Sequence, residues 1–473
     1  MCWCAPIATA PVAGGRFPPP SLRCRRHRGR SVRADASPEP VDTQRKKVAV
    51  AGAGWAGLAA AHHLVKQGYE VTLLGAESGP TEEIGLRGFW YPYRNIFSLV
   101  DELGISPFTG WTKAAYYSSQ GLAVEFPIFH DQPRLPAPFG MLTYPEFPSL
   151  PLIDRLTSIP VMAAVIDFNN TDTAWMKYDA MSARDLFKMF GCSQKLYKEI
   201  FQPAIQVALF APGEQCSAAA TLGMLVPTSL AINKDTACIS GIVCGEEVHE
   251  ADAFVLANGL SSLQYIIKNS PFLQSRQEFV NLLHLSTIDV VSIKLWFDKK
   301  ITIPKVANVC SGFDDPSGWT FFDLTSIYDD YADKSTTIVE AEFYNASHLL
   351  PLNDEQIVSE ASSHLIKCIQ DFEEATVIQQ LVRRSPKSTM HFLPGSYKYT
   401  VRGSTTLPNC LLLEKAYVTG LEAANRVVDY FGDGDFAKII AVEEDEPHIE
   451  TARNLNRRAN ELKTQIPFSE FFL

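Results

Sequence analysis

The 473-residue sequence lacks the features of several large protein classes. No stretch of about 18 uninterrupted apolar residues occurs, so no segment is predicted to span a membrane, although contact with a membrane surface stays open. The ten cysteines show no CxxC spacing, which argues against a disulfide framework and against a zinc site. No Ser-His-Asp order, metal-ligand cluster or Walker-type GKS or GKT motif stands out, so hydrolase and kinase functions have no support.

Acidic side chains are missing from residues 1–34. This segment holds seven arginines and the run Pro18-Pro19-Pro20, without hydrophobic periodicity. Such a composition is typical of an organelle transit peptide. Since Val32-Arg33-Ala34 resembles plastid processing sites, we predict a plastid transit peptide over 1–34, a linker over 35–45 and a chloroplast location. The alternative is a disordered basic arm for nucleic acid, which the acidic remainder of the chain disfavours.

The formal net charge is −11, and removal of the basic segment makes the remainder more acidic. An acidic body argues against nucleic acid or another polyanion as a partner. About 430 residues are more than one hydrophobic core usually organises, so we predict two domains.

A glycine-rich turn between an apolar strand and an Ala-rich helical stretch is the clearest motif, in residues 48–74. Gly52 allows a tight turn, Gly54 lets the backbone approach a pyrophosphate, and Gly57 lets the helix lie close to the strand. The free N–H groups at the start of the helix would then face the phosphates. We predict a βαβ unit that binds a dinucleotide, with five binding residues: Gly52, Gly54, Trp55, Ala56 and Gly57.

Further along, helices and strands alternate. A helical block is expected over 182–224, with Ser182 as an N-cap, and a helix is expected over 354–371. Residues 286–298 alternate so that Val291, Ile293 and Leu295 share one face, which predicts a strand. A second strand is expected over 336–343.

A short apolar strand, 253–259, ends in a small-residue turn. In dinucleotide-binding folds such a strand passes beside the first glycine turn, so Gly259 is a further cofactor-binding candidate. The nucleotide-binding part is therefore assembled from separated pieces of sequence. We predict an α/β fold with a Rossmann-like domain built from discontinuous segments and an inserted α+β substrate domain.

Four motifs in order carry a resemblance to a known family. They are GAGWAGLAAA at the glycine turn, EIGLRGFWYPYRNIFSLVDELGI at 83–105, LPAP at 135–138 and TGLEAANRV at 419–427. Together they resemble the flavin-dependent amine oxidase superfamily, and within it the phytoene and zeta-carotene desaturase-like branch of plants and cyanobacteria. The resemblance covers most of residues 46–435. It implies FAD held across the glycine turn and oxidation by hydride transfer to flavin N5.

The predicted domain boundaries follow from this comparison. The FAD-binding domain comprises 46–132, 241–285 and 405–440. The substrate domain comprises 133–240 and 286–404, and 441–473 form a C-terminal tail.

The resemblance assigns two more residues. Gly420 is expected to open a helix whose N-terminal amides point at the flavin pyrimidine ring, where they would stabilise the charge of the reduced flavin. Lys294 resembles the amine oxidase lysine that reaches flavin N5 through a water. Alternation along its strand puts Lys294 opposite the apolar face, so it is either a catalytic residue in a cavity or a solvated lysine. The aromatic residues Phe89, Trp90, Tyr91 and Tyr93 are expected to pack a core.

The sequence departs from the superfamily pattern at four points. Gly75 stands where a carboxylate usually accepts the ribose hydroxyls, and Glu77 is the candidate that replaces it. The loop after the second strand is short, and no Gly-Asp precedes Gly420. At residues 224–240 this sequence lacks a helix and a strand that the family has on the adenine side of the cofactor. Internal segments of the family are therefore missing, and weaker FAD binding is expected because each lost charged hydrogen bond costs about 1.5–3 kcal/mol.

We predict an FAD-dependent oxidoreductase of the carotenoid desaturase or isomerase type. Its substrate would be a small apolar polyene that enters through the Pro-rich region 133–168, and a quinone is the candidate acceptor. One alternative is a flavin amine oxidase that acts on a soluble amine, with Tyr417 as half of an aromatic pair. Another is a catalytically impaired isoform or scaffold with weak FAD binding.

Overall fold

In the computed structural model, most of the chain beyond the basic N-terminal segment can be described. The residues described are 45–75, 88–89, 93–108, 110, 112–126, 128, 150–168, 172–225, 241–244, 247–313, 318–332, 335–400, 412–440, 450–455 and 458. Within these ranges, no helix is both long enough and apolar enough to cross a bilayer.

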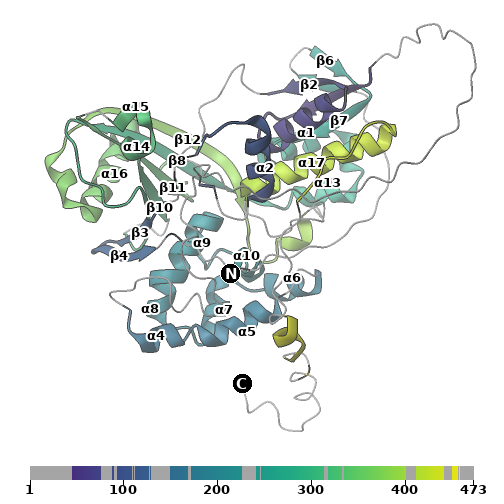
Figure 1. The fold of residues 1–473 in the computed structure, drawn as a ribbon. Coiled ribbons are helices and arrows are strands. Elements are labelled where there is room, and N and C mark those ends of the chain that lie inside the picture. Colours follow the sequence, from purple (N-terminus) through teal and green to yellow (C-terminus); the bar gives the residue numbers. More distant parts are fainter. Residues whose placement is uncertain are drawn as a thin grey trace, which may run out of the picture.

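A three-stranded parallel sheet contains the glycine-rich motif. Its order is β2 (Glu70–Leu74), β1 (Lys47–Ala51) and β7 (Ala253–Leu256). The helix α1 (Trp55–Lys66) follows β1, and α17 (Leu412–Phe431) lies beside α1 (Figure 1). Val48, Val50, Leu64 and Val428 meet in the core between them. The predicted βαβ unit and the neighbouring strand 253–259 are thereby confirmed.

The second sheet has seven strands and lies at the other end of the molecule (Figure 1). In order, its strands are β12 (Val377–His391), β8 (Ser286–Phe297), β11 (Thr337–Tyr344), β10 (Trp319–Asp323), β9 (Ala307–Cys310), β3 (Ala114–Ser118) and β4 (Gly121–Phe126). Only the β3–β9 pair of this sheet is parallel among the described strands.

One face of this sheet is covered by the long helix α16 (Asp354–Cys368). Val291, Ile293 and Leu295 of β8 share a buried cluster with Leu365 of α16, as their alternation predicted. Asn353 caps α16 and forms a capping box with Gln356. The short helices α14 (Leu324–Ile327) and α15 (Asp329–Ala332) connect β10 to β11. The segment η3 (Gln370–Glu374) leads from α16 into β12, and η4 (Tyr397–Tyr399) follows β12.

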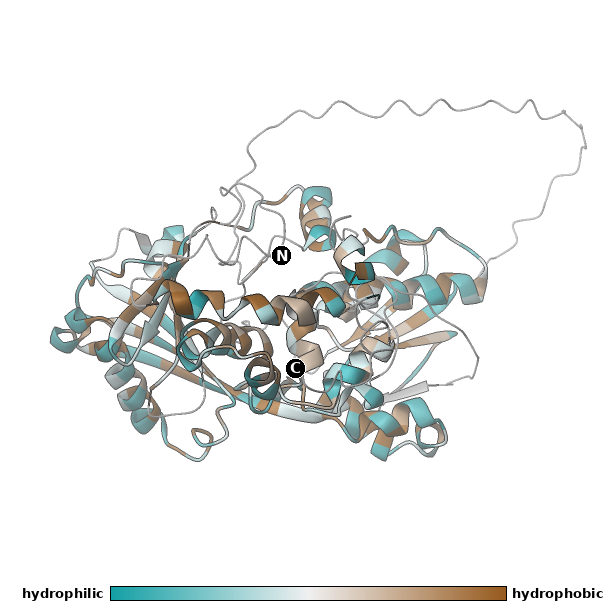
Figure 2. Ribbon diagram, turned by 90° about the horizontal axis from the view of Figure 1, so that it is seen from below, coloured by the Kyte–Doolittle hydropathy of each residue, from teal (hydrophilic) through white to brown (hydrophobic). Residues whose placement is uncertain are grey.

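The opposite face packs against a helical block, where apolar and polar segments alternate along the helices (Figure 2). This block contains the predicted helical segment 182–224 but begins earlier, at Leu152. The block consists of α4 (Leu152–Leu156), α5 (Ile159–Asp167), α6 (Asp172–Asp179), α7 (Ala183–Met189), α8 (Gln194–Leu196), the π-helical turn η2 (Tyr197–Phe201), α9 (Gln202–Leu209) and α10 (Ala218–Leu225).

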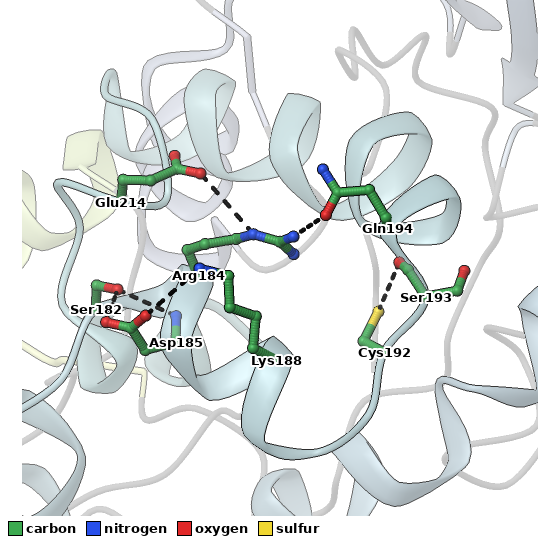
Figure 3. A network of polar contacts seen from close by, with 8 residues as sticks. All are labelled: Ser182, Arg184, Asp185, Lys188, Cys192, Ser193, Gln194 and Glu214. Carbon is green, nitrogen blue, oxygen red and sulfur yellow. Dashed lines mark hydrogen bonds and ion pairs between the residues drawn. The ribbon is translucent and has the colours of Figure 1, made fainter.

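Arg184 of α7 joins three parts of this block (Figure 3). It donates a hydrogen bond to Gln194, its Nε lies 4.0 Å from a Glu214 carboxylate oxygen, and its guanidinium lies 4.0 Å from the centre of the Tyr197 ring. The Ser182 hydroxyl accepts a hydrogen bond from the Asp185 amide, which confirms the predicted N-cap.

Smaller elements complete the nucleotide-binding part. They are α2 (Arg94–Leu103), the hairpin β5 (Gly241–Cys244) and β6 (Glu247–Glu250), and the helices α11 (Leu260–Lys268), α12 (Pro271–Gln274) and α13 (Gln277–Leu282).

One predicted boundary needs correction. The FAD-binding segment was extended to residue 132, but β3 and β4 pair with each other and β3 pairs with β9 of the seven-stranded sheet. Tyr116 and Tyr117 point to opposite faces of that sheet and join both of its cores. Short apolar strands carry no local signal for which sheet they enter, because pairing partners are set by tertiary packing. The other boundaries stay predictions.

Candidate functional site

The glycine turn between β1 and α1 is built as the motif predicts. Gly52 has φ +113°, a conformation that L side chains rarely adopt, and a Cβ there would collide with the Ala257 carbonyl of the neighbouring strand end. A Cβ at Gly57 would collide with the Gly52 carbonyl oxygen. These two glycines are therefore required by the fold itself.

Gly54 is different, because the surrounding protein does not require it. It caps α1 with φ −79°, which any residue can adopt, and an added Cβ would have no described atom within 4 Å. It is also exposed. The backbone at Gly54 is thus open to an approaching group, and no acidic side chain lies in the first turn of α1. A helix start of this kind favours a phosphate.

A further polar residue, Asn258, lies beside the turn just after β7. Asn258 follows that strand, and a Cβ on Gly52 would lie 3.0 Å from its backbone nitrogen. Its side-chain oxygen Oδ1 is buried and has no hydrogen-bond partner within the described part of the chain. Such an atom is usually satisfied by water or a ligand. Gly259 next to it is the N-cap of α11, and a Cβ there would also be unobstructed.

Sequence reasoning selected Gly259 and missed Asn258. Asn258 lies directly before the small-residue turn that marked Gly259, so its place at the carboxyl end of the parallel strand was the available signal. Ligands of parallel sheets bind at that edge.

The prediction that Gly420 opens a helix is wrong. The helix α17 begins at Leu412, so Gly420 lies inside it and its amide is not at a free helix end. A Cβ on Gly420 would collide with the carbonyl oxygen of Ala56. Its role is to let α17 approach the first turn of α1, and the predicted contact of its amide with the flavin ring does not fit this position.

The extra helical turns before Gly420 have a physical cause. Leu413, Tyr417, Val418 and Leu421 recur at helical spacing, and all four contribute to one buried cluster. With no Gly-Asp strand in the sequence to end there, the apolar segment continues the helix.

The same cluster contains the aromatic residues near the turn. The Trp55 ring meets Phe89 edge-on at 6.1 Å and Tyr417 at 6.5 Å between centroids. Phe89 and Tyr93 pack in this core as predicted, while Trp90 and Tyr91 lie outside the described residues. The Trp55 side chain is therefore a packing element, and burial raises the pKa of Tyr417 to about 12.

A buried carboxylate locks α17 to α2. Glu414 accepts hydrogen bonds from the Asn95 amide at 2.7 Å, the Asn95 side chain at 2.7 Å and the Ile96 amide at 3.0 Å. The side chain of Tyr93, the N-cap of α2, makes no capping hydrogen bond to the helix, and Glu414 caps α2 from a distant helix. Burial raises the pKa of Glu414.

Lys294 lies on β8, on the face toward the helical block. Its Nζ is 3.9 Å from Glu340 Oε2, directly across the β8–β11 pair, and its side chain is partly exposed. The Ser292 hydroxyl donates to Glu340 Oε1 at 3.3 Å. On the same face the Tyr344 hydroxyl donates to Glu342 at 2.9 Å. Lys294 is thus part of a polar row on the sheet, and a catalytic role stays a prediction.

The ribose contact also stays a prediction. Gly75 is the last described residue after β2 and offers no side chain, and Glu77 lies outside the described residues. Among the described side chains no group of three or more metal-binding residues gathers. The residues present fit the pyrophosphate end of a dinucleotide, held at Gly54, at the first turn of α1 and beside Asn258.

Comparisons with known proteins agree with this geometry. The family model described as "NAD(P)-binding Rossmann-like domain" matches residues 50–103. The chain is 22% identical over 464 residues to 15-cis-phytoene desaturase of Capsicum annuum, covering 82% of this chain and 74% of the relative. It is 23% identical over 447 residues to 15-cis-phytoene desaturase of Synechococcus elongatus, covering 80% and 93%.

Among solved structures, cyclohexylamine oxidase from Brevibacterium oxydans superposes with a TM-score of 0.57 at 11% identity. The superposition covers 82% of this chain and 100% of that chain. These comparisons confirm the predicted α/β fold class and the resemblance to the flavin-dependent amine oxidase superfamily. The two relatives named phytoene desaturase agree with an oxidoreductase function.

Proposed function

We propose that this chain is an FAD-dependent oxidoreductase that oxidises an apolar polyene in a plastid. The open backbone at Gly54 beside Asn258 carries the cofactor assignment, because it leaves room for a pyrophosphate at a helix start. When bound, the flavin would supply a hydride acceptor. The chain's own residues at Gly54, at the first turn of α1 and at Asn258 would hold the phosphates.

The carotenoid-like substrate is proposed from the relatives and from one surface. Both phytoene desaturases named above align over most of the chain. On the helical block, α4 and the start of α5 expose Leu152 at 69%, Ile153 at 70%, and also Leu156 and Ile159. We call these four residues the α4–α5 patch. Exposed apolar patches of this kind mark binding surfaces.

A membrane surface is the partner that this patch suits best. The α8 helix packs against α4, and Lys195 of α8 is exposed, as is Lys198 just after it. Apolar side chains beside lysines favour the interface of an anionic bilayer. A polyene dissolved in that bilayer could then pass directly to the substrate domain, and a quinone in the same membrane is the proposed electron acceptor.

The patch is tested by the double substitution Leu152→Ser and Ile153→Ser. Binding to vesicles of phosphatidylcholine with an anionic lipid is expected to fall by about tenfold or more, because two large apolar side chains no longer enter the interface. Tyr265→Ser is the matched control, since Tyr265 is 71% exposed on α11 and lies outside the patch. Equal loss in both proteins, or no loss in either, would contradict the membrane assignment.

The oxidoreductase proposal is tested with the purified full-length chain and added FAD. We expect the visible absorption bands of protein-bound oxidised flavin, and bleaching of these bands under anaerobic conditions with phytoene or zeta-carotene. No bound flavin after reconstitution would overturn the enzyme assignment and support the scaffold alternative.

A second candidate function, oxidation of a soluble amine, has one observation in its favour. Glu340 and Glu342 are buried carboxylates on the sheet face toward the helical block, and the Lys294 ammonium already lies 3.9 Å from Glu340, so this face accommodates a cation beside a carboxylate. Bleaching of the flavin by amines and not by polyenes would select this function.

A further inference from the structure

Two cysteine thiols meet inside the larger core. Cys310 at the end of β9 and Cys368 at the end of α16 have their sulfur atoms 3.8 Å apart. Cys310 is 1% exposed and Cys368 is 9% exposed. Cys192 and Cys216 have backbone carbonyls as their partners instead.

The surroundings of this pair argue against a nucleophilic cysteine and against a metal site. Cys310 lies opposite Tyr117 on β3 and Trp319 on β10, so its neighbours are aromatic rings. No cation is among the groups that act on the Cys310 thiol, and burial raises its pKa. A nucleophilic cysteine needs a nearby positive charge, and a metal site needs further ligands, which the described residues do not supply here.

We propose that Cys310 and Cys368 are a site of reversible disulfide formation, which covalently joins the C-terminal end of α16 to β9. A disulfide requires the two sulfur atoms to approach to about 2 Å. Rotation about the Cα–Cβ bonds moves each sulfur without moving the backbone. The pair comes from elements 58 residues apart in sequence, so the bond would close a long loop.

The oxidant is a small-molecule disulfide such as oxidised glutathione. Cys368 is the more exposed of the two thiols. Its thiolate attacks one sulfur of the oxidant, which releases one small thiol and leaves a mixed disulfide on Cys368. The Cys310 thiolate then attacks the Cys368 sulfur and releases the second small thiol. Two protein thiols are oxidised to one disulfide, and one small-molecule disulfide is reduced to two thiols.

The bond would tighten the contact between α16 and the seven-stranded sheet. Val358, Ala361 and Leu365 of α16 pack on that sheet, and Cys368 is the last residue of the helix. A long closed loop lowers the entropy of the unfolded chain, so the unfolding midpoint is expected to rise by roughly 5 °C or more on oxidation.

The experiment uses the full-length chain, incubated with oxidised glutathione, alkylated under denaturing conditions and digested without reductant. We expect a linked peptide pair that contains Cys310 and Cys368, loss of two free thiols, and reversal of both by dithiothreitol. The reaction should accelerate as the pH rises, because the buried Cys310 must lose its proton.

Cys310→Ala and Cys368→Ala should each abolish the linked peptide and the rise in unfolding midpoint, whereas Cys216→Ala should keep both. The peptide map of the unsubstituted protein needs no variant, so it decides even if a variant does not fold. Free Cys310 and Cys368 after complete oxidation, a mixed disulfide that persists on Cys368, or linkage to other cysteines would overturn the proposal.

Discussion

Replacing Gly54 with alanine is expected to weaken FAD binding by about 100-fold or more without changing the stability of the protein. The Cβ would have no described protein atom within 4 Å, and the φ of −79° suits alanine. The same Cβ would occupy the space through which a pyrophosphate approaches the backbone. A loss of about 100-fold corresponds to about 2.7 kcal/mol.

Two matched alanine substitutions separate binding from folding. Gly57→Ala should destabilise the protein by about 3 kcal/mol or more, because its Cβ collides with the Gly52 carbonyl. Gly420→Ala should do the same through the Ala56 carbonyl. Calorimetric titration with FAD and with ADP, together with thermal unfolding of each variant, measures both effects.

The outcome for Gly54→Ala distinguishes two positions for the cofactor. Equal weakening of FAD and ADP places the pyrophosphate at this turn. Unchanged affinity for both ligands would show that no phosphate contacts Gly54, and the cofactor assignment would fail there. A fall in the unfolding midpoint of Gly54→Ala would instead mean that protein atoms fill the space that the new Cβ enters.

Much of the nucleotide-binding part could be predicted from local sequence. The strand, turn and helix around Gly52 and Gly57 are specified by short-range sterics, since a side chain at either position meets backbone only a few residues away or on the adjacent strand. The strand at 253–256 could likewise be predicted from local sequence, because it is a short apolar segment that ends in small residues.

What could not be predicted depends on distant packing. Gly420 carries the same local signal whether it opens a helix or lies within one, and only the neighbouring Leu413 and Tyr417, packed against Trp55, extend the helix toward its N-terminus. Asn258 is a candidate ligand contact because its buried side-chain oxygen has no described partner, and no sequence pattern reveals this. The ion pair of Lys294 with Glu340 likewise follows from the register of two strands 46 residues apart, 340 − 294.

The second large effect is expected at Glu414. Replacing it with leucine should destabilise the protein by about 4 kcal/mol, because the buried amides of Asn95 and Ile96 lose the carboxylate that accepts from them. Asn95 also ties α2 to Ile440, donating to its carbonyl at 2.9 Å and accepting from its amide at 2.7 Å. Loss of the cap should therefore weaken the contact of α2 with α17 and its contact with Ile440.

Two controls separate the cap from a general effect of substitution. Glu414→Gln keeps one acceptor oxygen for Asn95 but turns a donor toward the Ile96 amide, so a smaller loss, about 1–2 kcal/mol, is expected. Glu373→Leu changes an exposed glutamate in η3 and should stay within about 0.5 kcal/mol of the unsubstituted protein. Denaturant unfolding followed by circular dichroism measures all three free energies.

The pH dependence of the deficit identifies the carboxyl group as its source. Burial raises the folded-state pKa of Glu414 above its ordinary value of 4.5. The carboxyl group therefore contributes most to stability below pH 4.5. This contribution is lost as the pH rises through the raised folded-state pKa, since ionisation of a buried carboxyl is unfavourable. The deficit of Glu414→Leu should therefore be larger near pH 4.5 than at neutral pH. A deficit that is equal at both pH values would mean that burial does not raise the pKa of Glu414. A deficit that Glu373→Leu reproduces would mean that Glu414 is not the cap that joins α17 to α2.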